Sequence, residues 1–134
     1  MQLPHGAVVA VVDGEKLNLF RNGGDEGALR LEAMPDLAVG VDNKGTGSRH
    51  QNSSANHDGG QQDEDNFGVG VTDVLNKQVL DGHIKNLLVI AAPRTLGELR
   101  KHYHKTLSAI LMGEIDKDLT GHALGDIEKA VAAK

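Results

Sequence analysis

The feature that most restricts the fold of this chain is a short, uninterrupted apolar run, Leu87-Leu88-Val89-Ile90-Ala91-Ala92. A strand with one face in water would alternate apolar and polar residues, and this run does not alternate. The run is also far shorter than the roughly 20 residues that a membrane helix requires. It therefore predicts a central parallel strand that is covered on both faces.

The first 35 residues predict an antiparallel meander of three strands. Residues 6–13 form a β-branched run that ends at Asp13-Gly14, a pair typical of hairpin turns. Residues 17–21 fit the return strand. Leu29, Leu31 and Ala33 alternate with Arg30, Glu32 and Met34, which fits a third strand. Together with the run at 87–92, the meander predicts an α/β fold with a mixed β-sheet and helices packed on its faces.

Helical spacing of apolar residues first appears between Phe67 and Val79. The acidic residues 63–65 would suit the N-terminus of this helix, and Asp81-Gly82 would end it. Leu124, Ile127 and Val131 recur at helical spacing as well, so we expect a C-terminal helix.

A further helix is expected after the central strand. Thr95 and Glu98 form a T-x-x-E capping box, which predicts that this helix starts at Thr95. Residues 107–115 are ambiguous, because their pattern fits either a continued helix or a last strand.

A polar segment interrupts these elements. Between residues 42 and 66 the only apolar side chain is Ala55. Such a segment buries too little apolar surface to offset its ordering entropy. We therefore predict a mobile loop at about residues 40–61, inside a single domain that spans residues 1–134.

Composition excludes several classes of function. The chain has no Cys, which rules out disulfides, thiolate zinc sites, iron–sulfur clusters and cysteine nucleophiles. It has two Phe, one Tyr and no Trp, too few for a stacked-aromatic nucleic-acid platform. The net charge of −5 argues against a protein that coats polyanions. The seven His match no zinc spacing, so we expect no metal and no cofactor.

Three stretches of the sequence resemble one family of bacterial proteins. They are the string PRTLGELRK at residues 93–101, the string EIDKDLT at 114–120, and the opening LPHG at 3–6 with DGEK at 13–16. Together they are similar to the host-attachment protein family, described as required for bacterial attachment to host cells. The resemblance implies a fold like the middle domain of archaeo-eukaryotic peptide release factors, an RNase H-like arrangement. It favours a strand at residues 107–116.

The first candidate site is Pro93-Arg94-Thr95, where a central strand ends and a helix begins. Free backbone N–H groups and the helix dipole favour an anion there, and Arg94 adds a positive charge. Arg100 and Lys101 lie further along the same segment. We therefore regard Arg94, Thr95, Arg100 and Lys101 as candidate binding residues. The alternative is a capped helix with a solvated basic face.

The second candidate site is Gly59-Gly60-Gln61. The resemblance implies a role for it, because release factors carry a Gly-Gly-Gln on a mobile loop before a helix, where it helps to position water against the peptidyl-tRNA ester. In this chain the acids Asp58 and 63–65 flank the tripeptide and would repel a phosphate backbone. Gln61 is thus a weak catalytic candidate, and the alternative is an ordinary loop whose glycines permit a turn.

Three hypotheses of function follow. The first is a non-catalytic binding module, linked to host attachment through contacts with RNA, with ribosome-associated factors or with a protein partner. The second is release-factor-like hydrolysis of the peptidyl-tRNA ester at Gln61. The third is a directly adhesive surface protein. Because the sequence shows no leader and no membrane helix, we expect a cytoplasmic protein without membrane contacts.

Overall fold

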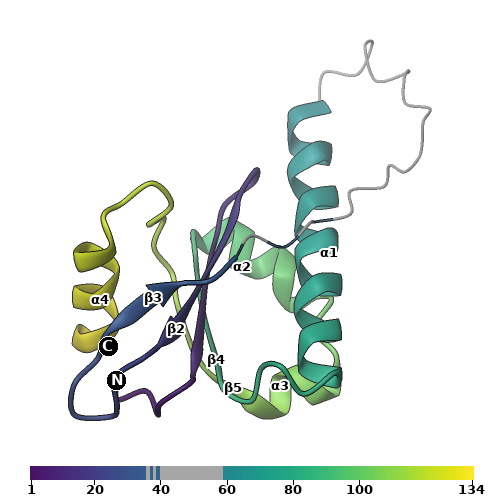
Figure 1. Ribbon diagram of the computed structural model, residues 1–134. Helices are drawn as coiled ribbons and strands as arrows, with labels where there is room; N and C mark the ends of the chain where they lie inside the picture. Colours follow the sequence, from purple (N-terminus) through teal and green to yellow (C-terminus); the bar gives the residue numbers. More distant parts are fainter. Residues whose placement is uncertain (36, 38, 40–58) are drawn as a thin grey trace.

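The computed structural model describes residues 1–35, 37, 39 and 59–134, and for residues 59–65 it describes the backbone only. Figure 1 shows the elements in this part of the chain. The strands are β1 (Val8–Val12), β2 (Leu17–Asn22), β3 (Leu31–Ala33), β4 (Leu87–Ala91) and β5 (Leu111–Ile115). The helices are α1 (Gly59–Leu80), α2 (Pro93–Arg100), α3 (Lys105–Ile110) and α4 (Leu124–Ala133).

The strands form one mixed sheet in the order β3-β2-β1-β4-β5. β1, β2 and β3 pair antiparallel, which confirms the expected meander. β4 pairs parallel with β1 on one side and with β5 on the other. The α/β fold with a mixed sheet, predicted from the sequence, is therefore confirmed.

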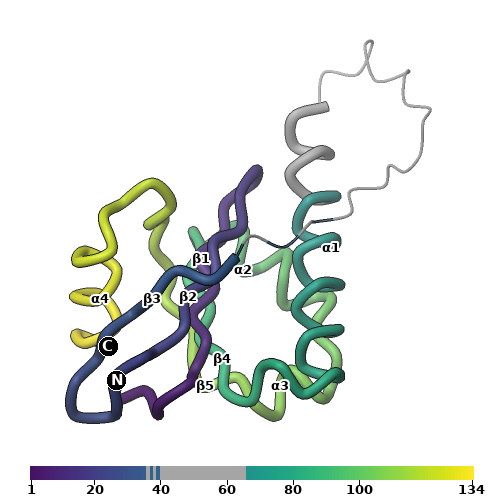
Figure 2. The backbone as a smooth tube through the Cα atoms, in the orientation of Figure 1, coloured from purple at the N-terminus to yellow at the C-terminus, as the bar shows by residue number. Residues whose placement is uncertain are grey.

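The two central strands are buried on both faces, as the apolar run of β4 predicts. Every residue of β1 and β4 has no exposed surface. On one face the strands pack against Val71 and Leu75 of α1, together with apolar residues of α2 and α3. On the other face they pack against Ile127 and Val131 of α4. The result is a three-layer arrangement, with α4 on one side of the sheet and the other three helices on the opposite side (Figures 1 and 2).

α1 confirms the helix expected between Phe67 and Val79, but it begins earlier than the sequence suggested. Gly59 already lies in its first turn, so the acids at 63–65 fall in the second turn rather than at the N-terminus. The predicted loop at 40–61 is wrong for residues 59–61, which are helical, and residues 40–58 lie outside the described part. The helix ends as expected, and Gly82 follows it with φ +81°.

Two further boundaries differ from the expectation. α2 begins at Pro93 with Ala92 as its N-cap, and no side chain caps it, so the capping box at Thr95 is wrong. Proline suits the first turn because its missing N–H would have no helical acceptor there. The strand expected at 107–116 is confirmed only from Leu111 to Ile115. Residues 107–110 belong to α3, because Leu107 is buried in the core cluster on the α1 face.

The C-terminal helix is confirmed as α4, with Ile127 and Val131 buried. None of the helices in the described ranges is long and apolar enough to cross a membrane.

The double-sided burial of β4 can be tested by truncating one of its side chains. We expect Ile90→Ala to lower the free energy of unfolding by about 2–5 kcal/mol, because it leaves a cavity beneath α4. Urea denaturation followed by circular dichroism measures the change. Leu80→Ala is the control, since Leu80 is 60% exposed, and it should change stability by less than about 0.5 kcal/mol. Equal effects of the two substitutions would contradict the assigned burial.

Candidate functional site

The candidate site lies at the edge of the sheet where the parallel strands β1, β4 and β5 end. Ligands of α/β proteins commonly bind at this carboxyl edge. The turn after β1, the start of α2 and the loop after β5 all begin there. α1 leads into β4 along one face of the sheet, so its N-terminal end lies toward the same edge (Figure 1). The two predicted sites, Pro93-Arg94-Thr95 and Gly59-Gly60-Gln61, therefore lie toward the same end of the molecule.

A hollow of about 420 Å³ opens at this edge, and we call it the carboxyl-edge hollow. Its lining residues come from the turn after β1, from the start of α2 and from the loop after β5. They are Asp13, Gly14, Glu15, Ala92, Arg94, Thr95 and Asp118. Two of the predicted site residues, Arg94 and Thr95, are therefore brought together with three acids that the sequence analysis did not select. Their position in the sequence could have identified these acids, because each lies within three residues of the end of a predicted strand.

Arg94 and Thr95 are the second and third residues of α2. The first helical hydrogen bond in this turn runs from the Leu96 amide to the Ala92 carbonyl oxygen, at 2.9 Å. The amides of Arg94 and Thr95 therefore have no acceptor within the helix and remain available to a ligand. Arg94 is exposed, and its guanidinium forms no ion pair with another described residue. This part of the hollow offers hydrogen-bond donors and positive potential.

Two of the three carboxylates of the hollow, those of Asp13 and Asp118, are held in place by local hydrogen bonds. Oδ1 of Asp13 accepts the amides of Glu15 and Lys16, both at 2.6 Å. Oδ1 of Asp118 accepts the hydroxyl of Thr120 at 2.6 Å and its amide at 3.3 Å. These bonds leave the second oxygen of each carboxylate free of a partner among the described residues. The hollow thus combines donors at α2 with acceptors at the two loops.

Arg100 and Lys101, also predicted as binding residues, do not line this hollow. They lie at the other end of α2, about 10 Å along the helix from Arg94. Lys101 Nζ is 3.3 Å from Oε1 of Glu98. The structure therefore separates this pair of basic residues from Arg94 instead of joining them in one basic surface.

Arg100 is part of a small network centred on Glu114 of β5. Its Nε and Nη2 donate to Oε1 of Glu114 at 2.8 and 2.6 Å, and the Tyr103 hydroxyl donates to Oε2 at 3.1 Å. The hydrogen bond and the negative charge of Glu114 raise the pKa of the Arg100 guanidinium. Burial, helped by the same carboxylate, raises the pKa of the Tyr103 hydroxyl. Arg100 thus has a structural partner that joins α2 to the edge of the sheet.

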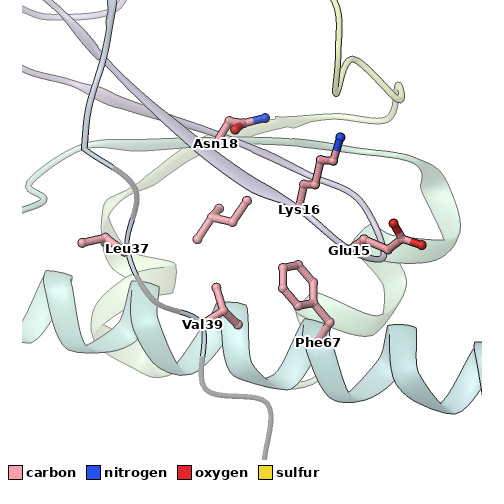
Figure 3. Close-up of a pocket in the computed structure, with 7 residues that line it drawn as sticks. Glu15, Lys16, Asn18, Leu37, Val39 and Phe67 are labelled. Carbon is pink, nitrogen blue, oxygen red and sulfur yellow. The ribbon is translucent and has the colours of Figure 1, made fainter.

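A second hollow, of about 390 Å³, lies on the α1 side of the β1–β2 turn (Figure 3). Phe67 of α1 reaches toward the part of the turn that carries Glu15 and Lys16. Glu15 lines both hollows, so they adjoin at this turn. Gly59-Gly60-Gln61 forms the first turn of α1, about two helical turns before Phe67. Its side chains lie outside the described part of the structure.

Metal-ligating side chains do not gather anywhere in the described residues: no group of three or more His, Asp or Glu could hold an ion there. His102 and His104, which are close in sequence, lie in the connection between α2 and α3.

A comparison with models of protein families matches residues 6–131 to bacterial archaeo-eukaryotic release factor family 12. The chain belongs to this family. The match spans the carboxyl-edge hollow and the whole of α1. It supports the relationship to release factors that the sequence motifs implied, and its description contains nothing on host attachment. A comparison with curated proteins finds no match.

The Glu114 network makes a prediction about pH, and Tyr103 is the only tyrosine of the chain. Its ionisation, followed by ultraviolet absorbance, should occur at a higher pH than the value of about 10 for free tyrosine. The folded protein holds this proton more tightly than the unfolded chain. The free energy of unfolding should therefore fall as the pH rises above about 10.

Glu114→Gln removes one cause of this shift and should lower the pKa of Tyr103 while burial keeps it above its ordinary value. An unshifted titration in the parent protein would contradict the assigned burial and hydrogen bond of Tyr103.

Proposed function

We propose that this member of the release factor family is a non-catalytic module that binds the end of an RNA chain at the carboxyl-edge hollow. The observation that carries the proposal is the hollow itself, which Arg94 and the start of α2 line together with the hydrogen-bonded carboxylates of Asp13 and Asp118. The family relationship supports a partner from the translation machinery. The acceptor end of a tRNA is the natural probe.

The mixed charge of the hollow favours an RNA end over a continuous RNA backbone. Arg94 and the start of α2 suit one phosphate group. The carboxylates of Asp13 and Asp118 would repel further phosphates, but they suit hydroxyl donors. The terminal ribose of an RNA supplies such hydroxyls beside a single phosphate. The proposed ligand therefore matches both halves of the hollow.

Arg94→Ala tests this proposal. Loss of one charge-assisted hydrogen bond should raise the Kd for a tRNA acceptor-stem minihelix about tenfold or more. Isothermal titration calorimetry measures this Kd. The salt concentration is kept modest and constant, because affinities for RNA depend on salt. The fold should be retained, since Arg94 is exposed.

The matched control is Lys129→Ala, which removes the same charge from an exposed position on α4, across the sheet from α2. It should leave the Kd nearly unchanged. If both variants bind the minihelix with the Kd of the parent, or if both raise the Kd equally, the carboxyl-edge hollow is not the RNA site.

A second candidate function is hydrolysis of the peptidyl-tRNA ester. It is favoured by one specific observation, the position of Gly59-Gly60-Gln61 in the first turn of α1, toward the same edge as the hollow. In this proposal the hollow holds the RNA end and Gln61 positions a water molecule against the ester.

Gln61→Ala discriminates between the two proposals. Under the hydrolytic proposal it abolishes the release of the amino acid from a peptidyl-tRNA analogue and leaves minihelix affinity within about twofold of the parent. Under the binding proposal neither the parent nor the variant accelerates release. A parent protein that releases the ester would overturn the non-catalytic proposal.

The link to attachment is a separate proposal, supported only by the resemblance of the strings at 93–101 and 114–120. We infer that this link is indirect and acts through RNA or the translation machinery in the cytoplasm. Recovery of the protein from the cell surface in a fractionation experiment would instead favour the directly adhesive alternative.

A further inference from the structure

The opposite edge of the sheet carries a hollow of a different character, and we call it the amino-edge hollow. It has a volume of about 320 Å³ and lies where β1 and β4 begin. Among the described residues, four that line it are basic, namely His5, Arg21, His83 and Lys85, and none is Asp or Glu. The carboxyl-edge hollow, by contrast, has three acids and one arginine.

The backbone around the amino-edge hollow is fixed by buried hydrogen bonds. The Val8 amide donates to the Asn86 carbonyl oxygen at 2.9 Å, which joins the segments that lead into β1 and β4. Asn22 is fully buried, and its side-chain amide donates to the Leu3 carbonyl oxygen at 2.9 Å. Its backbone carbonyl accepts the amide of Gly6 at 2.8 Å. The segment that carries His5 is therefore held against the end of β2.

Each basic residue is directed to the hollow by its place in the fold. Arg21 is the register partner of Val8, so its side chain emerges on the sheet face that α1 covers. His83 and Lys85 lie in the short connection from α1 to β4, where Ile84 between them is buried. The second residue of this connection is Gly82, whose φ of +81° disfavours other residues.

Arg21 and Lys85, the two strongly basic residues of this hollow, have no ion-pair partner within the described part of the protein. Two acids on the adjoining elements have other partners. Glu32, opposite Arg21 in β3, lies 3.5 Å from Nε of Arg30, and Asp81 lies 3.5 Å from Nζ of Lys77.

The histidines contribute a defined ring nitrogen each. Nδ1 of His5 is 2.8 Å from the carbonyl oxygen of Gly24, and Nδ1 of His83 is 3.1 Å from Oε1 of Gln78. Because these oxygens only accept, Nδ1 carries the hydrogen in both rings. Nε2 is then the nitrogen left to meet a ligand, as an acceptor toward a protonated phosphate oxygen or, when protonated itself, as a donor.

We propose that the amino-edge hollow is a second binding site, which takes the phosphate group of a small phosphorylated ligand such as a phosphate monoester or a diphosphate. Arg21, Lys85 and two histidines line a hollow that has no acid among its described lining residues, and this arrangement matches a compact polyanion. The site is independent of the proposed RNA site, because the five-residue strands β1 and β4 separate the two hollows by roughly 15 Å. Either proposal can fail without the other.

Inorganic pyrophosphate is the probe for this site, titrated into the full chain at constant ionic strength and followed by ¹⁵N NMR. We expect saturable shifts of the amides of Gly6, His83, Lys85 and Asn86. Arg21→Ala and Lys85→Ala should each raise the Kd about tenfold. Lys85 is exposed, so Lys85→Ala should retain the fold. This variant therefore still tests the site if Arg21→Ala does not fold. Lys129→Ala is the charge-matched control and should bind as the parent does.

The same variants distinguish the two sources of a phosphate group. If the site takes a free small phosphate compound, Lys85→Ala weakens pyrophosphate and leaves minihelix affinity unchanged. If it takes a phosphate of RNA, Lys85→Ala weakens both ligands. Shifts that do not saturate, shifts confined to Gly14, Arg94 and Thr95, or a Lys85→Ala variant that binds pyrophosphate as tightly as the parent would each overturn the proposal.

Discussion

The parallel pairing of β1 with β4 is the constraint on which the rest of the structure depends. All ten residues of the two strands are completely buried, so the sheet needs a helical layer on each face. The layer formed by α1, α2 and α3 follows from the two crossovers that a parallel arrangement requires. Each crossover leaves the sheet at its carboxyl edge and returns at its amino edge. The parallel pairing therefore also decides which loops lie together at each edge. The carboxyl-edge and amino-edge hollows are both consequences of it.

The sequence predicted the parts of the fold that depend on local patterns. The unbroken apolar run of β4, the Asp13-Gly14 turn and the spacing of Ile127 and Val131 each report burial directly, and the structure confirms their elements. The ends of the helices were harder to predict, because more than one capping signal can occur near the same helix start. Pro93 begins α2 although Thr95 and Glu98 carry the capping pattern, and α1 begins with two glycines, which have poor helix propensity. Tertiary packing of Leu107 likewise decided that α3 precedes β5.

The candidate site was predictable only in part, because sequence order does not reveal which loops share an edge. Arg94 and Thr95 could be selected from their place between a strand and a helix, and they line the carboxyl-edge hollow. Asp118 joins them only through the position of β5, which the sequence pattern left open. The charge contrast between the two edges was hidden as well, since Arg21, Lys85 and the histidines come from three separate segments. Membership of the release factor family agrees with the fold but does not choose between the hollows.

We propose that this protein binds RNA at the carboxyl edge of its sheet. The most direct measurement is an ¹⁵N NMR map of the full chain during titration with a tRNA acceptor-stem minihelix. We expect saturable shifts of the amides of Gly14, Arg94, Thr95 and the residues that follow β5, with the α4 face unaffected. Saturable shifts centred on α4, or a spectrum that does not respond to the minihelix, would contradict it.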